Sequence, residues 1–190
     1  MKSRLMYLIA FAFILVPFVS AALDEKPIQL GDPLPNITLS VPESLAHQEY
    51  LGLKGTGSFH IPDIKADLVI VEILSMYCPH CQKDAPLVNR LYQSIEKHPT
   101  AKGRVKVIGI GVGNDRFEVD LFTKKYEIQF PIFPDEEYTV HHQCGRPGTP
   151  YFFGVKLSAG GRYAIIHSQA GGFENPDDFL RMLLEKSGLA

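Results

Sequence analysis

Two cysteines, Cys78 and Cys81, are separated by two residues, and they are the part of this 190-residue chain best suited to chemistry. They follow the apolar run Leu68–Leu74 and precede a segment with helical periodicity, so they lie at a predicted strand-to-helix turn. Two thiols at this spacing can close a short disulfide and open it again, which indicates reversible two-electron chemistry. A static structural disulfide is the alternative, although a bridge across so short a loop stabilises little.

The two thiols are expected to have different roles. Cys78 stands at the start of the predicted helix, where the positive end of the helix dipole favours the thiolate and lowers the thiol pKa. We therefore predict that Cys78 attacks a substrate sulfur and that Cys81 resolves the mixed disulfide. His80 can stabilise the Cys78 thiolate further through a ring N–H or as imidazolium, which makes the couple more oxidising. The alternative for His80 is an exposed turn residue without effect.

Metal and haem sites also use cysteines at this spacing. A structural zinc site needs four ligands, and no second pair of suitable residues follows. Attachment of a c-type haem needs histidine directly after the second cysteine, where this chain has Gln82. We predict no metal among the site residues.

A copper carrier is the competing class of function. Such a protein would combine Cys78 and Cys81 with a distant histidine, and His141 and His142 stand three and two residues before Cys144. The alternative interpretation is that both histidines are solvated residues at a helix end. Cys144 is then a buried or unused thiol.

The elements around the cysteines follow from periodicity. The run Leu68–Leu74 is typical of a central strand covered on both faces, interrupted only by Glu72. Residues 79–97 have the pattern of an amphipathic helix and residues 104–112 that of a second buried strand, so the two strands should be parallel. The remaining predicted elements are strands within 36–40 and near 58–61, helices over 116–126 and 135–142, an antiparallel hairpin of 151–157 with 163–167, and a final helix between Asn175 and Gly188.

The N-terminus differs from the rest of the chain. Lys2 and Arg4 precede an apolar run that ends in small residues, which predicts a signal peptide over residues 1–22, with an uncleaved membrane anchor as the alternative. Residues 23–190 are the right length for one domain. Three cysteines in an exported chain leave one working pair and one spare thiol. We expect the periplasm or the outer face of the cytoplasmic membrane, and the net charge of −2 gives no sign of nucleic-acid binding.

Further motifs stand in order along the chain: Gly31–Pro35, Glu72 six residues before the first cysteine, Tyr77–Cys81, Asp84 and Pro86, Phe130–Pro131, and Gly148–Pro150. Together they resemble the thioredoxin-fold oxidoreductases, and most closely their secreted TlpA/ResA-like branch. The resemblance covers nearly all of the chain after residue 22. It implies an α/β thioredoxin fold: a central mixed β-sheet flanked by helices, with N-terminal extension strands and one inserted helix.

The resemblance also assigns site residues. It implies a cis peptide bond at Thr149–Pro150, packed against the cysteines, with the Thr149 backbone holding an incoming thiol or peptide. Glu72 and Asp84 match acids that take the proton of the second cysteine, provided that burial raises their pKa. The alternatives are that Glu72 reaches water or a lysine from the end of its strand, and that Asp84 interacts only with the helix dipole.

Two departures from the branch leave the direction of electron transfer open. Tyr77, which with Thr149 and Pro150 forms the expected substrate-binding wall, replaces the usual tryptophan. The dipeptide Pro79–His80 is the one found in strongly oxidising relatives, whereas the branch mostly reduces. The resemblance implies no cofactor beyond the Cys78–Cys81 disulfide itself. The expected partners are thiol- or disulfide-bearing exported proteins and a membrane or periplasmic electron donor or acceptor, with the protein itself a monomer.

A peroxidase of the same fold is the last alternative. That activity needs the pattern P-x-x-x-[ST]-x-x-C. Ser75 fits the middle position, but Val71 stands where the proline is required. The sequence therefore argues against peroxidase chemistry.

Overall fold

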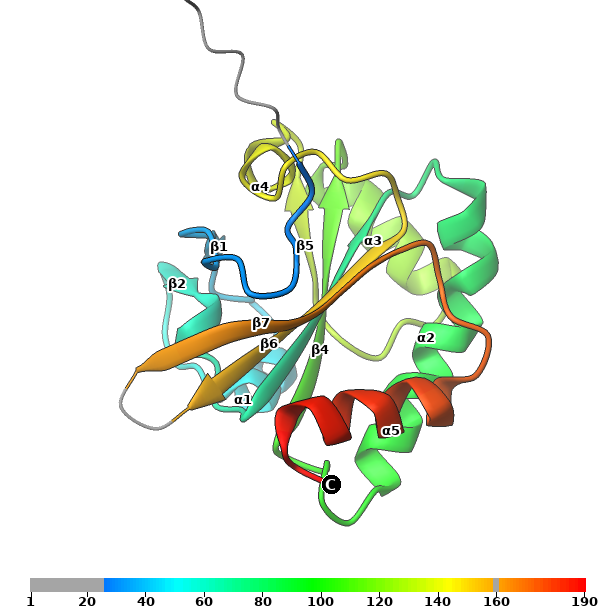
Figure 1. Ribbon diagram of the computed structural model, residues 1–190. Helices are drawn as coiled ribbons and strands as arrows, with labels where there is room; N and C mark the ends of the chain where they lie inside the picture. The colour runs from blue at the N-terminus through cyan, green and yellow to red at the C-terminus, as the bar shows by residue number, and fades with distance from the viewer. Residues whose placement is uncertain (1–25, 159–160) are drawn as a thin grey trace, which may run out of the picture.

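The computed structural model describes residues 26–158 and 161–190. At its centre is a mixed five-stranded sheet, in which three neighbouring strands are parallel and the other two are joined on by two successive antiparallel pairings (Figure 1). In spatial order the strands are β5 (Ile132–Asp135), β4 (Val105–Val112), β3 (Leu68–Leu74), β6 (Tyr151–Ser158) and β7 (Arg162–Ala170). The predicted thioredoxin-type arrangement of a mixed sheet with helices on both faces is confirmed.

Strand β3 is the central strand, and all seven of its residues are buried. Because side chains alternate across a strand, its residues divide between two cores. One core lies under three helices: α2 (Pro79–Lys97), α3 (Arg116–Lys125) and α5 (Pro176–Ser187). The other lies under the remaining elements: the two-stranded sheet of β1 (Thr38–Ser40) and β2 (Ser58–His60), helices α1 (Leu45–Leu51) and α4 (Thr139–Gln143), and the 3₁₀ turn η1 (Ile61–Asp63).

The long helices begin and end where capping residues predict. Cys78 is the N-cap of α2, and Pro79 occupies its first position, where no intrahelical N–H bond is lost. In α5 the Asn175 side chain accepts hydrogen bonds from two backbone N–H groups, and Gly188 ends the helix in a left-handed conformation. The predicted parallel pairing of β3 with β4 and the β6–β7 hairpin are also confirmed.

Two short regions differ from the prediction. The predicted helix over residues 135–142 is wrong in its first half, because Asp135 ends β5 and pairs with Val112 of β4. Only α4 is helical there, and the Asp135 carboxylate caps it by accepting hydrogen bonds from the backbone N–H groups of Val140 and His141, both at 2.9 Å. Helix α1 lies between the two strands predicted within 36–40 and near 58–61, in a segment for which no helix was predicted. Its seven residues are too few to show a clear helical period.

The predicted signal peptide lies outside the described residues. Within 26–158 and 161–190, no helix is both long and apolar enough to cross a membrane. The division into residues 1–22 and 23–190 therefore stays a prediction.

Candidate active site

The two cysteines lie at the carboxyl end of β3, where the chain turns into α2. The backbone N–H of Cys81 donates a hydrogen bond to Cys78 Sγ at 3.3 Å. Cys78 is half-buried, Cys81 is completely buried, and both are free thiols. An incoming sulfur atom can therefore reach Cys78 but not Cys81.

The two thiols have different pKa values because their environments differ. Partial burial raises the pKa of Cys78, but hydrogen bonds with the side chains of Cys81 and Thr149 lower it by more. Backbone N–H groups at the start of α2 act in the same direction, and the net pKa of Cys78 lies below the ordinary thiol value. The pKa of Cys81 is raised strongly, first by burial and then by its hydrogen bond with Cys78. Cys78 is therefore the thiol that ionises first.

The loop before β6 forms the wall opposite Cys78. The Thr149–Pro150 peptide bond is cis, as the resemblance implied. The Cys78 thiol donates to the carbonyl oxygen of Thr149, with Sγ and O 3.3 Å apart. Antiparallel pairing places Tyr151, the first residue of β6, opposite Ile73 near the end of β3. This pairing brings two segments far apart in sequence together at the reactive sulfur.

Glu72 lies behind the thiols, in the interior. It shares a strand face with Ile70 and Leu74, which belong to the core under α2, and only 4% of its surface is exposed. Burial raises the pKa of Glu72 to about 8, and the charges of Asp84 and Cys78 add to the effect. The alternative in which Glu72 reaches solvent at the strand end is excluded by this burial. An acid with this pKa can take up or release a proton near neutral pH.

Asp84 lies on the second turn of α2, and its side chain is half-buried. A Cβ added at position 172 would overlap with Asp84 Oδ2, so the carboxylate packs directly against the backbone of Gly172. Glycine at position 172 leaves the space that the Asp84 carboxylate occupies. Gly172 was not among the predicted site residues, because nothing local in the sequence relates it to α2.

Replacing Gly172 should therefore displace the carboxylate of Asp84. We expect Gly172→Ala to lower the free energy of unfolding by about 0.5–1.5 kcal/mol, because the end of the Asp84 side chain must turn away from the added methyl group. Gly148→Ala is the matched control, because a Cβ there meets no atom within 4 Å. Urea denaturation of both variants measures the effect, and equal midpoints would contradict the assigned packing.

The loop that presents Cys78 is held by two amide side chains that the sequence did not single out. Buried Asn114, just after β4, accepts a hydrogen bond from the backbone N–H of Met76 at 2.8 Å. Gln82 Nε2 donates to the Met76 carbonyl oxygen at 2.7 Å. A polar residue directly after a buried parallel strand is the signal that could have found Asn114.

The remaining predicted residues, Tyr77 and His80, are neighbours of Cys78 in the sequence or in the same turn. Tyr77 is exposed, and its hydroxyl donates to Glu118 in the first turn of α3. His80 is exposed as well, and its backbone N–H is one of the groups that lower the pKa of Cys78.

The His141–Cys144 segment lies elsewhere, in and after α4. Cys144 is buried, and its pKa is raised to about 12 by burial and by the charge of Asp135. His142 is exposed as predicted, but the prediction is wrong for His141, which is half-buried and bonded through Nε2 to the Pro147 carbonyl oxygen at 2.9 Å. In the part of the chain that the structure describes, no group of three or more His, Cys, Asp or Glu side chains is placed to hold a metal ion.

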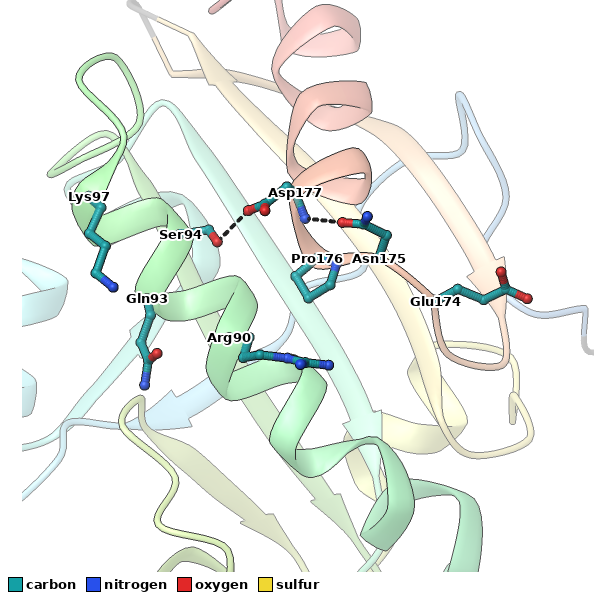
Figure 2. Close-up of a pocket in the computed structure, with 8 residues that line it drawn as sticks. All are labelled: Arg90, Gln93, Ser94, Lys97, Glu174, Asn175, Pro176 and Asp177. Carbon is teal, nitrogen blue, oxygen red and sulfur yellow. Dashed lines mark hydrogen bonds between the residues drawn. The ribbon is translucent and has the colours of Figure 1, made fainter.

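A separate cleft of about 420 Å³ lies between α2 and α5 (Figure 2). Ser94 donates to the Asp177 carboxylate at 2.6 Å across it, and the backbone N–H of Asp177 donates to Asn175. None of the thiol-site residues lines this cleft. It is therefore not part of the candidate active site.

A half-buried nucleophilic cysteine at a helix N-terminus, a buried partner three residues on, and a cis-proline wall define the class of thioredoxin-fold thiol-disulfide oxidoreductases. This protein is an enzyme of that class. Residues 30–163, most of the chain, match the AhpC/TSA family, and the chain belongs to this family. The buried Val71 of β3 stands at the proline position of the peroxidase pattern.

Individual relatives agree with this class. The thiol-disulfide oxidoreductase ResA of a Bacillus cereus strain is 25% identical over 141 residues, covering 71% of this chain and 72% of the relative. The TlpA/ResA-like resemblance is thus confirmed. ResA of Geobacillus thermodenitrificans is 22% identical over 130 residues, 68% of this chain and 65% of its own.

Solved structures show the same fold at lower identity. A putative thiol:disulfide interchange protein DsbE from Chlorobium tepidum has a TM-score of 0.62 at 16% identity, covering 86% of this chain and 99% of that one. StoA from Bacillus subtilis has a TM-score of 0.55 at 17% identity, and the match covers 78% of this chain and 98% of StoA. A secreted Mycobacterium tuberculosis disulfide oxidoreductase homologous to E. coli DsbE has a TM-score of 0.54 at 17% identity, covering 79% and 96%.

Proposed function

We propose that this protein acts outside the cytoplasmic membrane and exchanges electrons with cysteines of other exported proteins through a mixed disulfide on Cys78. The observation that carries the proposal is the division of labour between the two thiols: Cys78 is accessible with a lowered pKa, and Cys81 is buried with a raised one. Only the first can attack from solution, and only the second is held where it can displace a bound substrate.

In the reducing direction, the Cys78 thiolate attacks one sulfur of a substrate disulfide. The Cys78–substrate bond forms, the substrate disulfide breaks, and one substrate thiolate leaves. The ionised carboxylate of Glu72, the proposed acceptor, then takes the proton of Cys81, and the Cys81 thiolate attacks Cys78 Sγ. The Cys78–Cys81 disulfide forms, the second substrate thiol is released, and two electrons have passed to the substrate. The same steps in reverse oxidise a dithiol.

Export is supported by the basic and apolar pattern of residues 1–22. It is also supported by similarity to a relative described as secreted. The working pair needs no cofactor beyond its own disulfide. A membrane or periplasmic electron donor or acceptor would return it to its starting state after each turnover.

A stoichiometric exchange experiment tests the proposed function. Reduced protein is mixed with an unfolded polypeptide that contains one disulfide, and both products are analysed by mass spectrometry. We expect one substrate disulfide to be lost for each Cys78–Cys81 disulfide formed, with a decrease of two hydrogen masses in the protein. Tight one-to-one copper binding together with negligible exchange would instead support the copper carrier.

The reduction potential of the pair depends on His80, and two variants separate its side chain from its backbone. His80→Thr removes the imidazole but keeps the N–H that contacts Cys78, whereas His80→Pro removes both. We expect both variants to be more reducing and His80→Pro to show the larger change. Each tenfold change in the equilibrium with glutathione corresponds to about 30 mV. An unchanged equilibrium for both variants would exclude a role of His80 in the couple.

A further inference from the structure

Three aromatic side chains are exposed around the carboxyl edge of the sheet. The exposed fractions are 65% for Tyr77, 68% for Phe117 and 47% for Tyr138. Tyr77 follows the end of β3, Phe117 lies in the first turn of α3 just after β4, and Tyr138 follows β5. Because β3, β4 and β5 are neighbouring parallel strands, their carboxyl ends lie at one edge of the sheet (Figure 1), and the three residues each follow one of these strand ends. We call these residues the aromatic row.

Contacts within the structure hold the row together. The Tyr77 hydroxyl donates to Glu118, the residue after Phe117. At the other end, a Cβ added to Gly113 would overlap with the hydroxyl oxygen of Tyr138, so the tyrosine packs across the glycine that follows β4. One end of the row is therefore bonded to the first turn of α3, and the other packs on the β4–α3 connection.

The row begins beside the reactive sulfur, since Tyr77 directly precedes Cys78. Neighbouring strands lie about 4.8 Å apart, so a row across three strands spans roughly 10 Å, or about three residues of an extended chain. Exposed tyrosine and phenylalanine bury large areas at little entropic cost when a partner binds, and they are enriched at interfaces. An extended segment next to a substrate cysteine would fit along this row.

The charges beside the row are mainly acidic. Asp115 and Glu118 flank Phe117, and Glu136 and Glu137 directly precede Tyr138. The basic residue among them, Arg116, lies 3.7 Å from the carboxylate of Glu43. A segment that carries lysine or arginine together with apolar side chains is therefore complementary to this edge.

We propose that the aromatic row binds substrate polypeptides, selecting an extended segment with both apolar and basic side chains beside its cysteine. The inference rests on the proposed exchange with protein cysteines, and it adds the class of segment that is preferred. Phe117 and Tyr138 become specificity residues, although neither contacts the reacting sulfur atoms.

Peptides with one cysteine test this selection. Three peptides carry the cysteine as a disulfide with the same small thiol, and differ only in flanking residues: apolar with lysine, apolar with glutamate, or glycine and serine. Stopped-flow mixing with the reduced protein measures the rate constant of the first exchange, normalised to the rate of each peptide with free dithiothreitol. The lysine-containing apolar peptide should react fastest, and its advantage over the glutamate peptide should shrink at high salt.

Variants locate the selection on the row. Phe117→Ser and Tyr138→Ser should each slow the preferred peptide by about fivefold to tenfold and leave the exchange with glutathione disulfide unchanged. Tyr163→Ser is the matched control, since Tyr163 is also 47% exposed but lies on β7, the opposite edge strand.

Two outcomes would overturn the proposal: equal rates for the three peptides, or equal slowing by Tyr163→Ser. A self-association that Phe117→Ser abolishes would also overturn it, because the row would then be covered by a second copy of the chain. Failure of the unsubstituted protein to exchange with any peptide or with glutathione disulfide would instead reject the underlying function, so the two failures are distinguishable.

Discussion

Cys81→Ala should turn the protein into a trap for its substrates, whereas Cys78→Ala should reduce exchange to the level of the buffer alone. The reason is the difference in access: only Cys78 is reached from solution, and Cys81 lies completely buried behind it. Without Cys81, the mixed disulfide on Cys78 has no internal thiol to displace the substrate. Non-reducing electrophoresis and mass spectrometry of the adducts measure both effects.

Cys144→Ala is the control for these two variants. Its thiol is buried with a pKa raised to about 12, so it should neither form adducts nor release them. Equal residual turnover in the Cys78 and Cys81 variants would defeat the assignment of roles. Adducts that disappear only when Cys144 is replaced would mean that the third cysteine resolves the mixed disulfide.

Glu72→Gln should make the protein more stable at pH 8 and leave its stability nearly unchanged near pH 4.5. The folded-state pKa of Glu72 is raised to about 8 from an ordinary value of 4.5. Between these values the folded protein retains a proton that the unfolded chain releases, so the free energy of unfolding falls by about 1.4 kcal/mol for each pH unit as pH rises. Across the whole interval the effect is on the order of 4 kcal/mol.

Urea denaturation at several pH values from about 5 to 8 tests this sign and size. The difference in unfolding free energy between Glu72→Gln and the unsubstituted protein should grow as pH rises. Asp84→Asn provides a graded comparison, because the charge of Asp84 is the second cause of the raised pKa of Glu72. Asp84→Asn should move the pH range over which the free energy of unfolding falls to lower pH, and the fall itself should remain. A difference that does not change with pH would contradict the buried, protonated state of Glu72.

The same variants report on proton transfer during exchange. In the unsubstituted protein, the rate at which Cys81 closes the disulfide should rise with pH through an inflection near 8, since ionised Glu72 is the form that accepts a proton. The inflection should be absent in Glu72→Gln. Retention of the same pH profile would show that another group accepts the proton from Cys81.

The parts of the fold that the sequence predicted best are those decided by local patterns. Strand β3 and helix α2 have the predicted bounds, because a run of buried residues and a long amphipathic period are each visible within one segment. Helix α5 was predicted from its caps, Asn175 and Gly188, which act within a few residues.

The errors fall where pairing between distant segments decides the structure. Strand β5 has four residues, and its extended state depends on lying beside β4, where Gly109 leaves room for Ile132. A Cβ at position 109 would lie 2.9 Å from the Ile132 side chain. Neither residue by itself signals this contact, so no strand was predicted here, and the predicted helix began at Asp135, the last residue of β5.

The sequence by itself determined that two thiols stand at a strand-to-helix turn and that the first of them gains from the helix N-terminus, because both depend on neighbouring residues. Only the tertiary structure decided what faces those thiols. The contact from Cys78 to Thr149 joins residues 71 positions apart, and the bond from Met76 to Asn114 joins residues 38 apart. The raised pKa of Glu72 has the same origin, since burial and the interaction between charges depend on distances in space, which the order of residues does not contain.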